Sequence, residues 1–97
     1  MAETEDTTPE NAKFYYVYIL RCHDGDLYTG CTHNLKERFH RHQQGWVPVT
    51  KARGPVQLLW CCAFPDRSKA FDFEKYLKSG SGRAFAKKRL YVYPPKP

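Results

Sequence analysis

The feature that most constrains the fold is a hairpin pattern near the start of the chain. Residues 13–21 read KFYYVYILR, and their aromatic and β-branched side chains favour a β-strand. The Asp24-Gly25 pair that follows is a turn signal. Residues 27–32, LYTGCT, then read as a second strand. The two strands are expected to pair as an antiparallel hairpin, so the rest of the fold has to be built onto that pair.

A helix and a third strand are expected after the hairpin. The Asn34 side chain can cap a helix, and Glu37 three positions later completes a capping-box-like pattern. This helix is expected to stop before Gly45. The apolar run 56–64, VQLLWCCAF, then predicts a short buried strand.

Two further helices are expected in the last third of the chain. The first covers about 69–78, with Asp66 or Ser68 as its cap and Gly80 as its stop. The second covers about 83–90. The order β-β-α-β-α-α predicts an α+β domain, in which helices flank a three-stranded, mainly antiparallel sheet.

The charge of the chain is unevenly distributed. Residues 1–12 hold four acidic residues and no basic one, and we expect them to form a flexible acidic tail. The whole chain has 16 Lys and Arg against 10 Asp and Glu, so six acids remain outside this tail and the rest carries +10. A body this basic attracts polyanions, of which nucleic acid is the expected one. The domain itself is expected over 13–92, with a Pro-rich tail at 93–97.

The cysteines and the apolar runs point to a cytoplasmic protein without a membrane partner. Cys22, Cys31, Cys61 and Cys62 form neither a CxxC pair nor a zinc-ligand spacing, and reduced thiols are expected. The acidic start of the chain lacks the apolar region of a secretory signal. The apolar runs are all too short to span a bilayer.

Glu74 is the most informative single residue. On a helical wheel it falls inside the apolar arc formed by Ala70, Phe73 and Leu77. A carboxylate in such an arc is costly unless it is paired or bound to a cation. The alternatives are an ion pair with Lys78 at i, i+4, or a glutamate at the edge of the buried face.

Arg38 and His42 stand out on the first expected helix. They are four residues apart and flank the apolar face of Leu35 and Phe39. The guanidinium group suits phosphate because it offers two parallel hydrogen bonds. The alternative is an arginine that snorkels at the domain edge. His40 and His42 are two apart on a helix and face nearly opposite ways, so they are not expected to chelate a metal together.

Four sequence features, in this order and spacing, resemble the GIY-YIG nuclease domain. They are Tyr16-Val17-Tyr18, Tyr28-Thr29-Gly30, Arg38 eight residues after that glycine, and Glu74 on a later helix. The resemblance runs from about Phe14 to Leu90. It is strongest to the small stand-alone bacterial members and extends to the nuclease domain of the bacterial excision-repair incision subunit.

The resemblance implies a role for each matching position. Tyr18 and Tyr28 stand at the tyrosines of the two motifs, and one of them would position or deprotonate the attacking water. Arg38 would bind the scissile phosphate, and His42 would assist proton transfer or orient the phosphate. Glu74 would be the protein ligand of a single divalent ion, Mg²⁺ or Mn²⁺. Such an ion often binds through one carboxylate because it keeps most of its waters.

The chain departs from the family pattern at three places. Tyr16 replaces the glycine of the first motif, and Thr29 replaces the isoleucine or valine of the second. Cys31 stands where many members have a lysine after the second glycine. This last change removes one cation that would lower the pKa of a neighbouring tyrosine.

The resemblance implies a metal-dependent endonuclease that hydrolyses phosphodiester bonds in DNA, selecting branched, nicked or single-stranded structures. Five basic residues outside the motifs are candidates for contacts with the phosphate backbone. They are Lys51, Arg53, Arg83, Lys87 and Lys88. A protein partner could supply further specificity. The alternatives are a nucleic-acid-binding module of the same fold without catalysis, and a protein-interaction domain that uses its tyrosine face.

Overall fold

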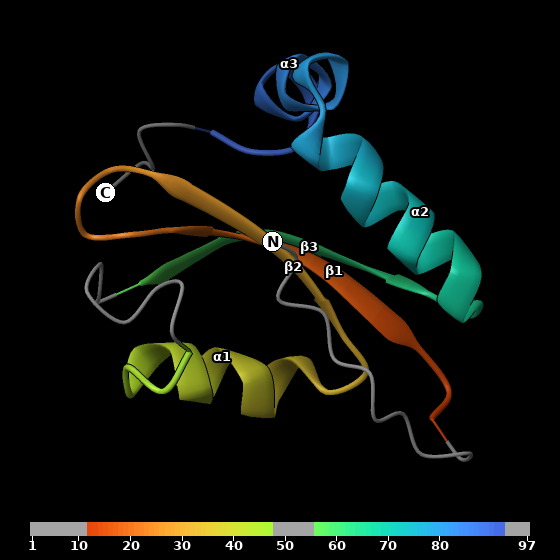
Figure 1. Cartoon of the computed structure of the whole chain (residues 1–97), viewed down its shortest axis with the longest axis horizontal. Helices are drawn as coiled ribbons and strands as arrows, with labels where there is room; N and C mark the ends of the chain where they lie inside the picture. Colours follow the sequence, from red (N-terminus) through yellow and green to blue (C-terminus); the bar gives the residue numbers. More distant parts are fainter. Residues whose placement is uncertain (1–11, 48–55, 93–97) are drawn as a thin grey trace.

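A three-stranded antiparallel sheet of order β2-β1-β3 organises the protein (Figure 1). The computed structural model describes residues 12–47 and 56–92. Its strands are β1 (Tyr15–Arg21), β2 (Leu27–Thr32) and β3 (Gln57–Phe64). The first two form the expected hairpin, in which Tyr18 pairs with Gly30. Gly25 turns the chain with a φ of 91°, a conformation that glycine adopts without steric cost.

The central strand β1 is the buried one. Its residues Val17 to Leu20 are almost completely shielded from solvent, since β1 has a neighbour on each side and a layer of helix on each face. The prediction that 56–64 forms a buried strand is wrong in this respect. β3 is an edge strand, and Leu58, Cys61 and Ala63 on it are exposed. Its apolar composition reflects the face that packs against α2, where Trp60 and Phe64 contact Phe73.

Helices cover both faces of the sheet (Figure 1). Helix α1 (Leu35–Gln43) lies on one face, where Leu35 and Phe39 pack against Tyr18 and Leu20. Helices α2 (Arg67–Lys78) and α3 (Gly80–Arg89) lie on the other face. There Ala70, Leu77 and Ala86 join Val17 and Ile19 in a second core. The predicted α+β class and the order β-β-α-β-α-α are therefore confirmed.

The ends of the helices follow from local hydrogen bonds. The Asn34 side chain accepts the Glu37 N–H at 3.2 Å and begins α1, as expected. Asp66 rather than Ser68 caps α2, because its carboxylate accepts the Lys69 N–H at 2.9 Å.

The junction of α2 and α3 differs from the sequence prediction. Ser79 ends α2, and its hydroxyl caps α3 by accepting the Gly82 N–H at 3.1 Å. Gly80 is therefore not the stop of α2. The third helix starts at Gly80 instead of residue 83, because one serine serves both helix ends.

Several expected features lie outside the described residues. They are residues 1–11 of the acidic tail, Lys51 and Arg53 of the basic loop, and the Pro-rich residues 93–97. Among the helices of the described ranges, none has the length and apolar character needed to cross a bilayer.

Replacing Gly82 with alanine should destabilise the protein by about 1–3 kcal/mol, the usual cost of overpacking. A Cβ at Gly82 would overlap the backbone carbonyl of Tyr76, and backbone cannot move aside as a side-chain tip can. Helix α3 would have to shift away from α2. Urea unfolding of the wild type and G82A measures the difference.

Gly80 provides the matched control for this substitution. It lies in the same helix, but a Cβ added there would meet nothing within 4 Å. G80A should keep or slightly raise the stability, by less than about 1 kcal/mol. Equal stability of G82A and G80A would contradict close packing at the α2–α3 junction.

Candidate active site

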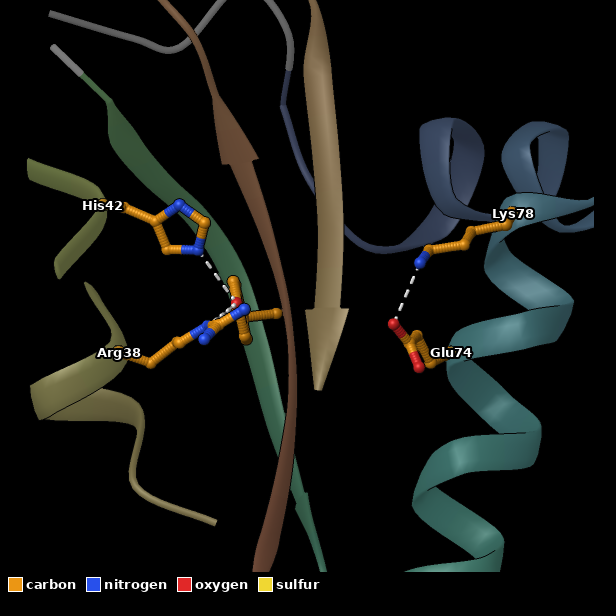
Figure 2. Close-up of polar contacts among 5 residues, drawn as sticks. Arg38, His42, Glu74 and Lys78 are labelled. Carbon is orange, nitrogen blue, oxygen red and sulfur yellow. Dashed lines mark hydrogen bonds and ion pairs between the residues drawn. The ribbon is translucent and has the colours of Figure 1, made fainter. Parts of the chain in front are cut away.

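Four of the residues singled out by the sequence meet between the sheet and α1. Tyr18 comes from β1, Tyr28 from β2, and Arg38 and His42 from successive turns of α1. All four side chains are buried. The Asn34 cap sets the start of α1, and the four-residue spacing then turns Arg38 and His42 together toward the sheet. Figure 2 shows both side chains reaching from α1 to the strands.

The Tyr18 hydroxyl lies at the centre of this group. It is 3.4 Å from Arg38 Nε, which can only donate, so the tyrosine oxygen accepts this bond. It is also 3.0 Å from His42 Nε2. The hydroxyl oxygen has a second lone pair, so the tautomer of His42 sets the direction of this bond: Tyr18 donates to an unprotonated Nε2 and accepts from a protonated one. In the tautomer with Nε2 unprotonated, the bond links Tyr18 to His42 as a route for the hydroxyl proton.

Gly30 makes room for the Tyr18 ring. The two residues are paired across β1 and β2, so their side-chain positions are on the same face of the sheet. A Cβ added to Gly30 would overlap the hydroxyl end of Tyr18. The tyrosine ring therefore lies across edge strand β2, with its hydroxyl above Gly30. The glycine of the second motif is required here by close approach, since its φ is not positive.

Burial keeps both partners of the Tyr18–His42 bond uncharged near neutral pH. It raises the pKa of Tyr18 to about 12, against the opposing effect of Arg38. Burial, followed by the charges of Arg38 and Arg41, lowers the pKa of His42 to about 4. The resting network is thus a neutral phenol hydrogen-bonded to a neutral imidazole, and Arg38 carries its positive charge.

The Tyr18 hydroxyl holds Arg38 by accepting a hydrogen bond from its Nε. Burial lowers the pKa of the guanidinium, but this bond and the electrostatic influence of Tyr18 and Tyr28 outweigh burial and raise the pKa. The Tyr28 ring also packs 5.0 Å from the His42 ring, measured between centroids. Arg38 is consequently a fixed cation in a buried setting, rather than an arginine that snorkels into solvent.

Glu74 lies on the opposite side of the sheet. It points inward from α2 and is 2% exposed, which confirms its place in the apolar arc. Its Oε2 accepts a hydrogen bond of 2.9 Å from Lys78 Nζ, so the i, i+4 ion pair is also present. Figure 2 shows Glu74 and Lys78 on one side of the strands, with Arg38 and His42 on the other. The structure therefore brings four of the five expected catalytic residues together. It places the fifth, Glu74, on the opposite face of the sheet.

The Glu74 charge on one face of the sheet nevertheless affects the pKa of Tyr18 on the other face. The negative charge of Glu74 contributes to the raised pKa of Tyr18, although less than burial does. Cys31, the residue after Gly30, is buried on the Glu74 side. Burial and then the Glu74 charge raise the pKa of its thiol to about 12. A small neutral side chain thus occupies the position next to Glu74 where many family members have a lysine.

Glu74 has the chemistry expected of a divalent-metal ligand. Within the described residues no group of three or more His, Cys, Asp or Glu side chains could surround an ion. A lone carboxylate still fits Mg²⁺, which binds through one or two carboxylates and keeps several waters. The residue that competes for this carboxylate is Lys78, whose side chain is 31% exposed.

The basic candidates on α3 are all exposed. Arg83, Lys87 and Lys88 project from a helix on the Glu74 side of the sheet. Helix α3 lies in the same layer as α2, on the opposite face of the sheet from α1 (Figure 1). Sequence reasoning missed the Tyr18–His42 bond, since residues 24 positions apart carry no signal of contact.

A family model described as the GIY-YIG catalytic domain matches residues 14–89. The chain therefore belongs to the GIY-YIG family, and the resemblance seen in the motifs is confirmed. This membership supports a nuclease-type function with nucleic acid as substrate. GIY-YIG nucleases generally depend on a divalent metal.

The relatives are small proteins of the UPF0213 group. A UPF0213 protein of Oceanobacillus iheyensis is 43% identical over 65 residues, which are 66% of this chain and 76% of that protein. One from Clostridium perfringens is 44% identical over 64 residues, 65% of this chain and 69% of its own length. The solution NMR structure of a UPF0213 protein from Bacillus halodurans is similar in fold, with a TM-score of 0.51 at 35% identity. That likeness covers 77% of this chain and 83% of the other.

The stability of the protein should fall between about pH 6.5 and 4 because of His42. In the unfolded chain this imidazole has its ordinary pKa, so it takes up a proton that the folded protein excludes. Stability from this group is complete above pH 6.5 and declines by up to about 1.4 kcal/mol per pH unit below it, on the order of 3 kcal/mol in total. Urea unfolding at a series of pH values measures the slope.

H42Q and H40Q separate this effect from other titrations. Glutamine at position 42 keeps a hydrogen-bonding group but does not titrate, so the decline should become shallower. His40 is exposed on the same helix, and H40Q should retain the steep decline. The same slope in H42Q and in the wild type would show that His42 is not the group responsible.

Proposed function

We propose that this protein is a metal-dependent endonuclease that hydrolyses phosphodiester bonds in DNA. The observation that supports this most directly is the Tyr18 hydroxyl held between Arg38 and His42. It combines a fixed cation with a hydrogen bond that can carry a proton between Tyr18 and His42. A packing network would not need the guanidinium to remain charged and buried at the same point.

Arg38 is the proposed phosphate-binding residue. Its guanidinium is fixed before substrate arrives, so little reorganisation is needed when negative charge builds up on the phosphate oxygens. The Tyr18 hydroxyl accepts from its Nε at 3.4 Å, and arginine stays charged at any physiological pH. Tyr28, whose ring packs 5.0 Å from that of His42 between centroids, is the proposed positioning residue on β2.

Tyr18 and His42 are the proposed proton route. As the water oxygen bonds to phosphorus, its proton passes to Tyr18 Oη while the hydroxyl proton passes to His42 Nε2. The bond from phosphorus to the leaving sugar oxygen breaks, and that oxygen is protonated from solvent. A bound phosphate favours this transfer because its negative charge raises the pKa of His42.

Glu74 is the proposed ligand of a single Mg²⁺ or Mn²⁺. When bound, such an ion stabilises charge on the phosphate and on the leaving oxygen. Glu74 itself holds a negative charge in a buried position on α2. This assignment agrees with the general metal dependence of the family.

The proposed substrate is DNA recognised by charge and shape. Arg83, Lys87 and Lys88 on α3 supply contacts to the phosphate backbone, which position a duplex without reading its sequence. Because such contacts do not read sequence, the proposed selectivity is for branched, nicked or single-stranded structures rather than for a defined sequence. A protein partner would add further specificity.

One observation favours a second candidate, a nucleic-acid-binding module without catalysis. The pKa values of Tyr18, about 12, and of His42, about 4, are both far from neutrality. Neither group is a strong base in the resting protein. If substrate does not shift these values, Arg38 binds phosphate and no proton moves.

Cleavage should require metal and should depend on Arg38, Tyr18 and Glu74. R38A, Y18F and E74Q should each lower the rate by about 10²- to 10³-fold, the range for loss of one preorganised donor. D72N is the control, because Asp72 is an exposed acid two residues from Glu74 on the same helix. The assay uses labelled branched, nicked, single-stranded and duplex DNA, and matching RNA, with Mg²⁺, Mn²⁺ or EDTA. Salt-sensitive binding without cutting in any of these conditions would establish the binding module instead.

Nucleic-acid affinity should depend strongly on salt concentration because the basic residues of α3 contact phosphates. The variant in which Arg83, Lys87 and Lys88 are all replaced by alanine should bind more weakly. The slope of log affinity against log salt concentration should become shallower by up to about 3, since each lost phosphate contact contributes about 0.9. Fluorescence anisotropy with labelled DNA at several salt concentrations measures both quantities.

A matched triple variant controls for net charge. Lys13, Lys36 and Lys69 are also exposed, but they lie away from α3. Replacing these three lysines with alanine removes the same charge and should leave most of the salt slope intact. A loss of slope as large as that of the α3 variant would show that α3 is not a specific contact surface.

A further inference from the structure

The ion pair between Glu74 and Lys78 closes the proposed metal site from within the same helix. Lys78 Nζ lies 2.9 Å from Glu74 Oε2, and the side chains are 31% and 3% exposed. The pair is thus unequal, with a carboxylate in the core and an ammonium group near the surface. Lys78 follows Glu74 by one helical turn, so α2 presents both groups side by side.

The buried Glu74 carboxylate is stabilised by the partly exposed Lys78 ammonium. A carboxylate out of contact with water is costly unless a cation or hydrogen-bond donors compensate its charge. Lys78 provides both a charge and a donor at Oε2. Its flexible four-carbon side chain can also return the ammonium to water, since part of that side chain is already exposed.

A divalent ion and the Lys78 ammonium cannot both bind the Glu74 carboxylate with full affinity at the same time. Both are positive and would share one carboxylate, so their separation would be a few ångströms in a poorly solvated region where like charges repel strongly. Within the described residues no group of three or more His, Cys, Asp or Glu side chains could hold an ion, so no cluster of further acids is available there to absorb the extra charge.

We propose that Lys78 is a built-in competitor for the divalent ion at Glu74. It compensates the carboxylate while no metal is bound, and it has to leave when metal binds, which weakens the apparent metal affinity. The protein then keeps a stable core without metal and becomes loaded only at sufficient metal concentration. This inference rests on the proposed role of Glu74 as a metal ligand.

The test is a metal titration of the full chain followed by NMR. Mg²⁺ is added to ¹⁵N-labelled wild type, K78M, K78R, K75M and E74Q, and the amide shifts of α2 give the dissociation constants. Mn²⁺ broadening then locates the ion. Changing a group that is hydrogen-bonded to a metal ligand typically lowers affinity by about 10- to 100-fold. Lys78 differs because its positive charge repels the ion, so its removal should change affinity by a similar factor in the opposite direction. We expect Mg²⁺ to bind K78M about tenfold more tightly than the wild type.

Two variants serve as controls for charge and for packing. K78R keeps the positive charge and should retain the weak affinity of the wild type. Lys75 is exposed on the same helix, and K75M removes one charge without touching Glu74, so its affinity should also be unchanged. Thermal unfolding and the amide spectra verify that each variant is folded before the titration is interpreted.

The outcomes separate this inference from the proposed function. Equal or weaker Mg²⁺ binding in K78M than in the wild type, with binding abolished in E74Q, would overturn the competition while leaving Glu74 as the ligand. Unchanged binding in E74Q would remove Glu74 from the metal site and overturn both. Tighter binding in K75M as well would show a general charge effect and would also overturn the role of Lys78.

Discussion

The arrangement of one face of this protein depends on the buried hydroxyl of Tyr18. The Tyr18 side chain extends from the central strand β1 over Gly30 of β2. Its hydroxyl lies between Arg38 and His42 of α1. Arg38 Nε can only donate, so the Tyr18 oxygen accepts from it, and the same hydroxyl is hydrogen-bonded to His42 Nε2. Loss of this oxygen would remove one hydrogen bond each from Arg38 and His42, at a cost of about 0.5–1.5 kcal/mol per bond. Helix α1 is therefore located on the sheet by the same contact that organises the candidate site.

The parts of the fold that sequence predicted well are those with local signals. The Asp24-Gly25 turn joins strands that pair as expected, and Asn34 begins α1 through a bond three residues away. The order of the strands is not local, because it depends on which neighbour β1 accepts on its second edge. An apolar run such as 57–64 is compatible with a central strand or with an edge strand packed on one face, and only the sheet order distinguishes them.

The candidate site shows the same limit. Helical periodicity placed Glu74 in an apolar arc, and the structure agrees. Periodicity within α2 cannot say on which face of the sheet that arc packs, so the separation of Glu74 from Arg38 was not predictable. The uncharged state of Tyr18 and His42 also could not be predicted from the sequence, because it results mainly from burial in the folded protein. The Glu74–Lys78 pair was visible from spacing alone, as one of two explanations for the carboxylate.

The proposed reaction requires the two halves of the site to act on one phosphate, and edge strand β2 is where they approach each other. Successive residues of a strand point to opposite faces, so Gly30 lies beneath Tyr18 while Cys31 lies toward Glu74. Both are small, and β2 has no further strand beyond it. Glu74 contributes to the raised pKa of Tyr18, so charges on the two faces influence each other. In the proposed reaction, a phosphate bound by Arg38 would lie along the β2 edge, where an ion held by Glu74 would act on the same group. A side chain added at Gly30 would overlap the hydroxyl end of Tyr18 and displace it from this edge, so the proposed reaction requires a glycine at this position of β2.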